Sequence, residues 1–414
     1  MPDLKSTLLR YGRHVSRQKT LTRMDFPITR EEALRRLDDF VPVAGSAYAR
    51  LRNKDRGKDD HIHVSRLSAA LRRRLISEGE VVEAVLRRHG LSAAEKYVSE
   101  IFWRTYWKGW LEQRPAVWRS YLEAVKQSQE QVMADPGIKI RYVAAIEART
   151  GIDCFDAWAA ELEDTGYMHN WARMQFASIW IFTLGLPWEL GAAYMFDRLI
   201  DADSASNTLS WRWVAGLHTA GKAYLADAER ITAMTDGRYA PRGLARTARI
   251  PADNLETPPV AAIRPFRTPD LAAASLLLLT AEDLSVERIA AFRALPVRAI
   301  AVAAGRNGWD DVALADGLSR ALEAWPNAPQ IESSDARSVA AASKELGCTQ
   351  VVTAFLPVGP QETSLSFLRS ELEGQGLVFS EYLRAWDRNA WPYCRRGFFG
   401  LKEKIPSLVQ KMSD

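Results

Sequence analysis

The sequence predicts two domains of different class, an all-helical domain followed by a small α/β domain. In the first part, apolar residues recur at the three-to-four spacing of amphipathic helices. In the second part, short apolar runs alternate with helical segments, which is typical of a parallel sheet covered by helices. A stretch rich in proline and glycine lies between them. We therefore expect a helical domain over residues 1–236, a linker over 237–268 and an α/β domain over 269–414.

The helical domain shows its periodicity from Thr29 to about Ile231, where glycine and proline are sparse. The clearest predicted helices are Glu31–Phe40, Leu67–Glu78, Val81–His89, Ala93–Trp110 and Arg141–Glu147. Residues 1–25 are basic and lack a clear period, so we expect an arm or a frayed first helix there.

The linker and the α/β domain differ in their local signals. Prolines and glycines interrupt residues 237–268 at short intervals, which predicts an irregular segment strapped over the surface. The predicted strands after it are Ser275–Thr280, Val297–Ala303, Thr349–Phe355 and Leu377–Phe379. The predicted helices between and after them are Val286–Ala294, Val312–Trp325, Ala336–Leu346 and Ser364–Glu373. This alternation predicts a Rossmann-like parallel sheet, a fold that supports many functions and decides none.

Composition is that of a globular protein, with 47% hydrophobic and 26% charged residues among 414. No apolar run reaches the roughly 20 residues that span a bilayer, and no signal peptide is visible, so we expect a cytoplasmic protein without membrane contact. The three cysteines are far apart, which predicts neither a disulfide framework nor an iron–sulfur cluster.

Positive charge is concentrated near the start of the chain. Residues 1–90 hold 20 Lys and Arg against 12 Asp and Glu, whereas residues 269–414 hold 15 against 18. A basic front half favours contact with a polyanion, and this part of the chain includes the successive residues Arg72, Arg73 and Arg74. An ordinary solvated surface is the alternative interpretation.

Motifs of standard chemistry are missing from the sequence. There is no GxGxxG after a strand, no P-loop, no HExxH and no GxSxG. His61 and His63 have the spacing of two ligands on a strand, but we expect surface residues there and no metal site.

Three blocks of residues carry the functional signal. They are His63–Ser68 with Tyr48 upstream, Glu100–Trp107, and the long stretch from Gly166 to Trp213, where charged and amide side chains stand among tryptophans. Buried charges of this kind need a partner. Together the blocks resemble the FAD-binding domain of the DNA photolyase/cryptochrome family over roughly residues 29–230. The resemblance implies a photolyase-type helical domain with FAD bound inside it.

The resemblance implies a set of residues around FAD. Ser65 and Ser68 would meet the pyrophosphate at a helix start, although Val64 stands where the family usually has Thr. Arg173 would pair with Asp201. Asn207 would lie by atom N5 of the flavin ring, and an Asn at this position favours a repair enzyme over a cryptochrome. The full implied set is Tyr48, Val64, Ser65, Arg66, Leu67, Ser68, Tyr97, Arg104, Asn170, Arg173, Asp201, Ala202, Asp203 and Asn207. For Asp201 and Asp203, the alternative is helix capping and a surface pair.

The resemblance also implies catalytic residues that face damaged DNA, namely Glu100, Trp103, Asn170, Met174 and Trp213. Enzymes for the 6-4 photoproduct carry His at the positions of Asn170 and Met174, so the chain looks like the cyclobutane-dimer type. Trp103 and Trp213 would stack on the flipped bases, with a core role as the alternative.

Two departures from the family pattern concern tryptophans. Trp171 stands where cyclobutane-dimer enzymes usually carry an Arg that approaches the lesion or the backbone. Trp211 and Trp188 match two members of the electron relay, but Asp135 falls at the third position. Trp180, Trp158 and Trp118 are the candidate substitutes.

Domain order is the last departure. The family usually places its α/β antenna domain before the helical domain. The segments Val339–Val352 and Gly397–Lys404 resemble that antenna domain faintly, which suggests a permuted domain order. An antenna chromophore is then possible, but its identity does not follow from the sequence. The resemblance implies a monomer that repairs cyclobutane pyrimidine dimers in DNA with blue light. The basic front half, including Arg72, Arg73 and Arg74, would then hold the DNA backbone. A cryptochrome-like photoreceptor is the first alternative, and a flavin-binding protein without light function is the second.

Overall fold

A computed structural model describes residues 26–58, 60–219, 221–252 and 258–411. The chain forms two compact units that alternate along the sequence. The mixed unit comprises 26–39, Arg66–Ala84 and Arg264–Arg388. The helical unit comprises 40–65, 85–263 and the segment from Asn389 onward. The units thus divide the chain differently from the expected boundaries at 236 and 268, which stay a prediction, and the expected arm at 1–25 lies outside the described residues.

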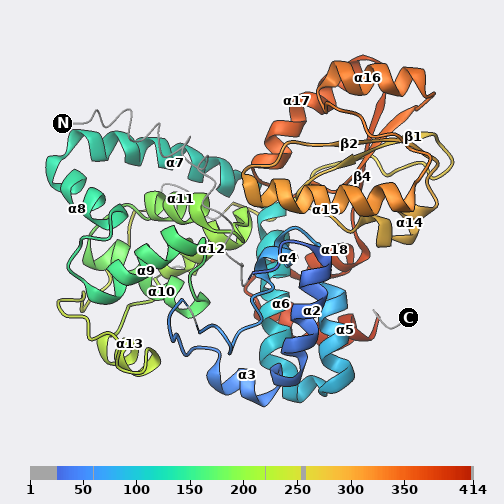
Figure 1. Ribbon diagram of the computed structural model, residues 1–414. Coiled ribbons are helices and arrows are strands. Elements are labelled where there is room, and N and C mark those ends of the chain that lie inside the picture. Colours follow the sequence, from blue (N-terminus) through green and yellow to red (C-terminus); the bar gives the residue numbers. More distant parts are fainter. Residues whose placement is uncertain (1–25, 59, 220, 253–257, 412–414) are drawn as a thin grey trace. The chain divides into compact units, whose positions relative to one another are not determined.

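The mixed unit contains a four-stranded parallel sheet (Figure 1). Its strands are β1 Ser275–Leu279, β2 Val297–Val302, β3 Gln350–Ala354 and β4 Val378–Tyr382, in the order β2-β1-β3-β4. Register is set by pairs such as Leu277 with Ile300 and with Val352. The predicted α/β class and all four predicted strands are confirmed, and β4 extends three residues beyond its predicted end.

Helices cover both faces of this sheet because the strand side chains are apolar on both. Leu276 and Leu278 pack toward α16 (Ala336–Glu345) and α17 (Pro360–Gly374). Leu277 and Leu279 pack in the second core with η3 (Val286–Arg288), α14 (Ala290–Arg293) and α15 (Gly308–Ala324). The doubly covered sheet is therefore the arrangement that continuous apolar strands require. Also in this unit are most of α2 (Arg30–Phe40), α4 (Ser68–Arg72), part of α5 (Glu78–Arg88) and most of α18 (Ala385–Ala390).

The three successive arginines at the end of α4 are buried inside the mixed unit. Arg72, Arg73 and Arg74 are 3%, 0% and 5% exposed. Arg72 Nη2 lies 2.8 Å from Glu282 Oε1, and Arg73 Nη2 lies 2.7 Å from Asp310 Oδ1. The proposed contact of these arginines with a DNA backbone is therefore wrong, because their guanidinium groups neutralise carboxylates within the unit.

Arg74 also neutralises buried carboxylates, and it has more partners than Arg72 or Arg73. Its guanidinium binds Asp387 and lies 3.4 Å from Glu78 and 3.6 Å from Asp283. Asp283 in turn binds Arg384. The Arg384 and Arg74 guanidiniums outweigh the effect of burial and hold the pKa of Asp283 below its usual range. This network joins the segment around Arg74 to the sheet-bearing part of the unit.

The helical unit is built around α6 (Leu91–Glu112), which contacts α3, α7, α12 and the C-terminal segment. The other helices are η1 Val41–Val43, α3 Ser46–Leu51, α7 Pro115–Ala134, α8 Pro136–Ile146, α9 Asp153–Thr165, α10 Asn170–Ser178, the π-helical turn η2 Ile179–Thr183, α11 Trp188–Arg198, α12 Ser204–Val214 and α13 Ala228–Met234. Near the C-terminus it adds η4 Trp391–Tyr393, α19 Phe399–Lys402 and α20 Ile405–Gln410. The described residues of the expected linker contain no helix or strand.

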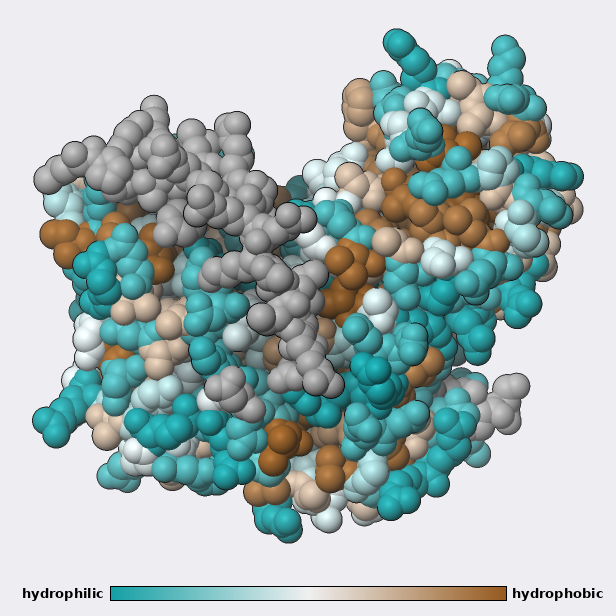
Figure 2. Space-filling model, viewed as in Figure 1, coloured by the Kyte–Doolittle hydropathy of each residue, from teal (hydrophilic) through white to brown (hydrophobic). Residues whose placement is uncertain are grey.

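The visible faces of both units are mostly hydrophilic, with apolar patches between the polar side chains (Figure 2). Exposed large apolar residues include Ile140, Phe367 and Phe399. Among the described helices, none is both long and apolar enough to cross a membrane. The described residues also hold no group of three or more His, Cys, Asp or Glu side chains arranged for a metal ion. Cys154, Cys348 and Cys394 are buried thiols.

Candidate functional site

Two cations on α6, the half-buried Arg104 and the buried Lys108, define the first part of the candidate site. Arg104 and Lys108 are four residues apart, so they lie on the same face of the helix. Lys108 is only 4% exposed, which requires an anionic partner. Asp203 supplies it: its Oδ2 atom lies 3.3 Å from Lys108 Nζ and 3.8 Å from Arg104 Nη1.

Asp203 also begins α12. Its carboxylate accepts a hydrogen bond from the backbone N–H of Ser206 at 2.8 Å, so Asp203 is the N-cap of this helix. The side chain is 5% exposed. The capping alternative for Asp203 thus describes one of its two roles, and the pairing with α6 is the other.

A second ion pair, between half-buried Arg173 and buried Asp201, lies just before this helix start. Arg173 on α10 places Nη2 3.0 Å from Asp201 Oδ2, and its Nε donates to the carbonyl of Met168 at 2.8 Å. Asn207, in the first turn of α12, donates from Nδ2 to the carbonyl of Ala192 on α11 at 2.8 Å. The structure therefore brings Arg173 and Asp201 together as predicted and ties Asn207 to the neighbouring helix.

Glu100 forms an ion pair elsewhere on α6. Arg52, just after α3, donates from Nη1 to Glu100 Oε1 at 2.6 Å. Burial raises the pKa of Glu100, and the charge of Arg52 opposes that shift. Close to this pair, Tyr48 and Tyr97 meet edge to face with ring centroids 5.0 Å apart, and burial raises the pKa of Tyr48.

The segment predicted to bind pyrophosphate is described only in its local structure. Ser68 is the first residue of α4, as the prediction of a helix start requires, and Arg66 has a positive φ of 57°. Leu67 is fully buried, whereas Val64 and Ser65 are half-buried. Because Ser65 belongs to the helical unit and Arg66 to the mixed unit, their joint role with the helical site stays a prediction.

The residues predicted to face DNA differ in exposure. Asn170 is exposed at the start of α10, and Met174 is half-buried one turn later. Trp213 is also half-buried and packs against Tyr224 with ring centroids 5.5 Å apart. These exposures are compatible with contact to a ligand.

Trp103 has a neighbour that the sequence did not suggest. The ring of Phe398 stacks on it with centroids 3.9 Å apart and planes inclined by 12°. One face of Trp103 is therefore covered by the C-terminal segment of the same unit. Residues almost 300 positions apart leave no local signal, so sequence reasoning missed Phe398.

Trp171 is a core residue of the helical unit. It is 1% exposed and meets Trp158 edge to face at 6.3 Å. It therefore cannot replace an arginine that reaches the DNA backbone, and its position is explained by packing. Next to it, His169 accepts a hydrogen bond from Trp171 N at Nδ1, and burial lowers the pKa of His169 to about 4.

His61 lies inside the helical unit, although we expected it at the surface. It is 4% exposed, and its Nε2 atom lies 3.0 Å from Glu161 Oε1. The expectation was wrong because the partner acid is 100 residues away in the sequence. His63 is half-buried.

The two tryptophans of the predicted relay contact different aromatic rings. Trp211 packs edge to face on Trp180 with centroids 6.2 Å apart, and Trp180 packs on Tyr142 at 5.9 Å. Trp188 instead contacts Tyr121 at 5.6 Å. Of the three candidate substitutes, Trp180 is thus the one in ring contact with Trp211.

Gly191 allows this close approach. A Cβ atom there would overlap the ring of Trp211 and lie 2.9 Å from Trp180. The small residue on α11 is therefore required by the packing of these two tryptophans.

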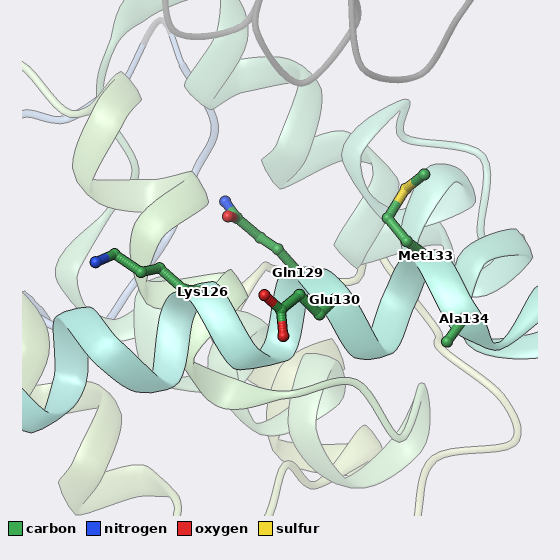
Figure 3. A pocket seen from close by; sticks show the side chains of 5 residues that line it. All are labelled: Lys126, Gln129, Glu130, Met133 and Ala134. Carbon is green, nitrogen blue, oxygen red and sulfur yellow. The ribbon is translucent and has the colours of Figure 1, made fainter.

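A shallow hollow on α7 is a poor candidate site. Its lining is Lys126, Gln129, Glu130, Met133 and Ala134, all from one helix (Figure 3). It combines one cation with one anion and has no buried polar group, so it offers no preference for a ligand.

Sequence reasoning missed Lys108 and Ser206 in the site itself. The signal for Lys108 was its spacing of four residues from Arg104 within the aromatic-rich stretch Ile101–Leu111 of the helix. Ser206 Oγ and Arg104 Nη1 are buried and have no hydrogen-bond partner among the described residues. Both groups are donors, so the site is suited to a ligand that presents acceptor atoms.

Comparison with known proteins identifies similarity in this region. Residues 97–262 match the family described as the FAD binding domain of DNA photolyase. The chain is 30% identical over 218 residues to the deoxyribodipyrimidine photo-lyase of Streptomyces griseus and 26% identical over 203 residues to that of Escherichia coli. These matches cover 52% and 48% of this chain but 42% of each relative, so the chain spans less than half the length of these relatives.

Two further similarities extend the range of relatives. Cryptochrome-1 of Arabidopsis thaliana is 31% identical over 116 residues, which are 27% of this chain and 17% of that protein. The solved structure of a bacterial class III photolyase from Agrobacterium tumefaciens is 28% identical, with a TM-score of 0.41 over 50% of this chain and 43% of that one.

Proposed function

We propose that the chain binds FAD and repairs cyclobutane pyrimidine dimers in DNA with blue light, because residues 97–262 match the FAD binding domain of DNA photolyase. The observation that carries this proposal is the presence of two ion pairs with buried aspartates at the start of α12. Arg173 with Asp201, and Lys108 with Asp203, fall inside the matched region.

The donor chemistry of the site fits FAD. Arg104 Nη1 and Ser206 Oγ are buried donors without a hydrogen-bond partner among the described residues. Flavin carbonyl oxygens, ribityl hydroxyls and phosphate oxygens all accept hydrogen bonds. Asn207 would hold its amide at the flavin, since Nδ2 is fixed by Ala192 O. The remaining residues that the resemblance implies, including Tyr48, Tyr97 and Val64–Ser68, are part of this proposal.

Reduced FAD would supply the electron that splits the dimer after light absorption, and the chain itself positions the reactants. Asn170, Met174 and Trp213 are exposed or half-buried and would surround the extruded bases. Glu100, held by Arg52 at 2.6 Å, would hydrogen-bond a pyrimidine edge. Arg173 and Lys108 neutralise the two aspartates, so the site needs no other counterion.

A flavin photoreceptor without repair is the competing function. It is favoured by the stacking of Phe398 on Trp103, because a covered ring face offers no platform to a base on that side. Similarity to both photo-lyases and a cryptochrome leaves both functions within the family.

Photorepair of a defined substrate tests the proposal. The purified chain, loaded with FAD and reduced, is illuminated with an oligonucleotide that contains one cyclobutane thymine dimer. We expect loss of the dimer in blue light and none in the dark. Intact dimers in the light, with FAD fully bound and reduced, would exclude repair and favour the photoreceptor. The variant Asn170→Ala should lower affinity for the damaged DNA while the protein keeps its yellow colour.

A further inference from the structure

The C-terminal segment Trp391–Lys404 forms a basic and aromatic surface on the helical unit. Its backbone runs along α6, which η4, α19 and α20 all contact (Figure 1, dark red). It carries Arg395, Arg396, Lys402 and Lys404 against Glu403. The strong positive charge of this surface stands beside Trp103, which Phe398 contacts.

The backbone of the segment is held by donors from α6 and the turn after it. Gln113 Nε2 donates to the carbonyl of Trp391 at 2.9 Å, and Arg114 Nη2 donates to that of Arg395 at 2.6 Å. Tyr106 Oη donates to the carbonyl of Arg396 at 2.8 Å. Three carbonyls in six residues therefore point inward, and the segment is fixed before any ligand arrives.

Packing supports these hydrogen bonds. Gly109 leaves room for the ring of Trp391, because a Cβ atom at that position would overlap it. Trp391 is 3% exposed and Cys394 is fully buried against α6. The segment is thus a built part of the unit, with Phe398, 5% exposed, as its last anchor before α19.

Several other side chains of the segment are exposed to solvent. Arg395 and Arg396 are exposed, and neither is recorded in an ion pair among the described residues. Phe399 is 74% exposed, although it follows the buried Phe398 directly. Lys404 is exposed over the ring of Tyr393, and Lys402 pairs with Glu95 at 2.7 Å. Arginines free of carboxylates next to an exposed phenyl ring suit a partner with both phosphates and flat bases.

We propose that Trp391–Lys404 is a DNA-binding element, in which Arg395, Arg396 and Lys404 hold the phosphate backbone and Phe399 stacks on an unpaired base beside the lesion. This inference rests on the proposed function, since it places the damaged strand next to Trp103. It assigns to the C-terminal segment the backbone contact that the buried Arg72, Arg73 and Arg74 cannot make. Phe398 holds the element on the ring of Trp103.

Salt dependence of DNA binding tests the element. The full chain is titrated with a labelled single-stranded oligonucleotide that contains one cyclobutane thymine dimer, at several salt concentrations. For Arg395→Ala/Arg396→Ala we expect weaker binding and a log–log salt slope that is shallower by about 1.4, or about 0.7 for each lost phosphate contact. For Phe399→Ala we expect about tenfold weaker binding with an unchanged slope.

A matched control removes two exposed arginines from another part of the same unit. Arg246→Ala/Arg249→Ala changes the net charge equally, and both side chains lie on the surface. We expect it to leave the slope nearly unchanged. Equal effects of the two double variants would overturn the proposed element, because binding would then depend only on net charge.

The remaining outcomes separate this proposal from the proposed repair function. If the wild-type chain repairs dimers but neither Arg395→Ala/Arg396→Ala nor Phe399→Ala weakens binding, the element is wrong and repair stands. If the wild-type chain binds FAD but no DNA, both fail. Basic and aromatic surfaces also bind anionic membranes. Binding of the wild type to phosphatidylserine vesicles in preference to DNA, lost in the same variants, would therefore contradict the assignment of DNA as partner.

Discussion

The pairing of Lys108 with Asp203 leads to a quantitative prediction about stability. Lys108→Met keeps the length of the side chain but removes its charge, which leaves Asp203 buried with Arg104 at 3.8 Å and the N–H of Ser206 at 2.8 Å. Removing one partner of a buried ion pair costs about 3–5 kcal/mol. Because two other contacts of Asp203 survive, we expect the lower end, about 3 kcal/mol, or roughly a hundredfold in the folding equilibrium.

Urea unfolding of the FAD-free chain, followed by tryptophan fluorescence, measures this loss. Lys126→Met is the matched control, since Lys126 is 73% exposed and lies 3.9 Å from Glu123. The control should lose less than about 0.5 kcal/mol. The double variant Lys108→Met/Asp203→Asn should recover part of the loss, because the unpaired anion is also removed. Equal unfolding midpoints for Lys108→Met and Lys126→Met would refute the reasoning.

Three further predictions follow from the helical unit. Burial, aided by the charges of Arg212 and Arg114, lowers the pKa of His218 to about 4. The contribution of neutral His218 to stability is therefore complete above the unfolded pKa of about 6.5 and is lost as pH falls from there toward 4. Urea titrations of His218→Gln should show a loss of unfolding free energy between about pH 7 and about pH 5 that is smaller than in the wild type by up to about 2 kcal/mol. Gly191→Ala should lower the free energy of unfolding by about 1–3 kcal/mol, since the added methyl overlaps Trp211, and an unchanged value would show that α11 can shift. Trp180→Phe should slow light-driven reduction of bound FAD by an external thiol more than Trp188→Phe does, because Trp180 is the ring neighbour of Trp211; the reverse order, in a transient-absorption experiment, would restore the relay first expected.

Sequence periodicity predicted the mixed unit well because its sheet is locally encoded. Each strand is a short apolar run, and both faces of the sheet need apolar residues, so alternation with helices left one plausible class. The family resemblance, rather than periodicity, implied a helix start at Ser68 and the pairing of Arg173 with Asp201, and the structure has both. These features lie within segments of a few dozen residues.

Charge and distant contacts were predicted poorly. An excess of positive charge near the start of the chain suggested a DNA surface, yet Arg73 and Arg74 find their acids at Asp310 and Asp387, more than 200 residues away. The net charge of a segment does not indicate which of its guanidinium groups are buried in the folded chain. His61 with Glu161, and Trp103 with Phe398, were missed for the same reason, since only the folded chain brings these residues together.

The interleaving of the two units along the chain was also not predicted from the sequence. The segment Gly397–Lys404 was compared with an antenna domain, but its residues belong to the helical unit, where the backbone near Arg396 accepts a hydrogen bond from Tyr106. The permuted domain order and an antenna chromophore stay predictions.

Binding of FAD to the chain tests the central claim most directly. Titration of the FAD-free protein, followed by flavin fluorescence, should show saturable binding of one FAD per chain for the wild type. The double variant Arg173→Met/Asp201→Leu replaces the buried ion pair by apolar side chains, a change that often leaves stability nearly unchanged, and it should lose this binding while unfolding at a similar urea concentration. Equally tight binding of FAD to a folded double variant, or none to the wild type, would contradict the account.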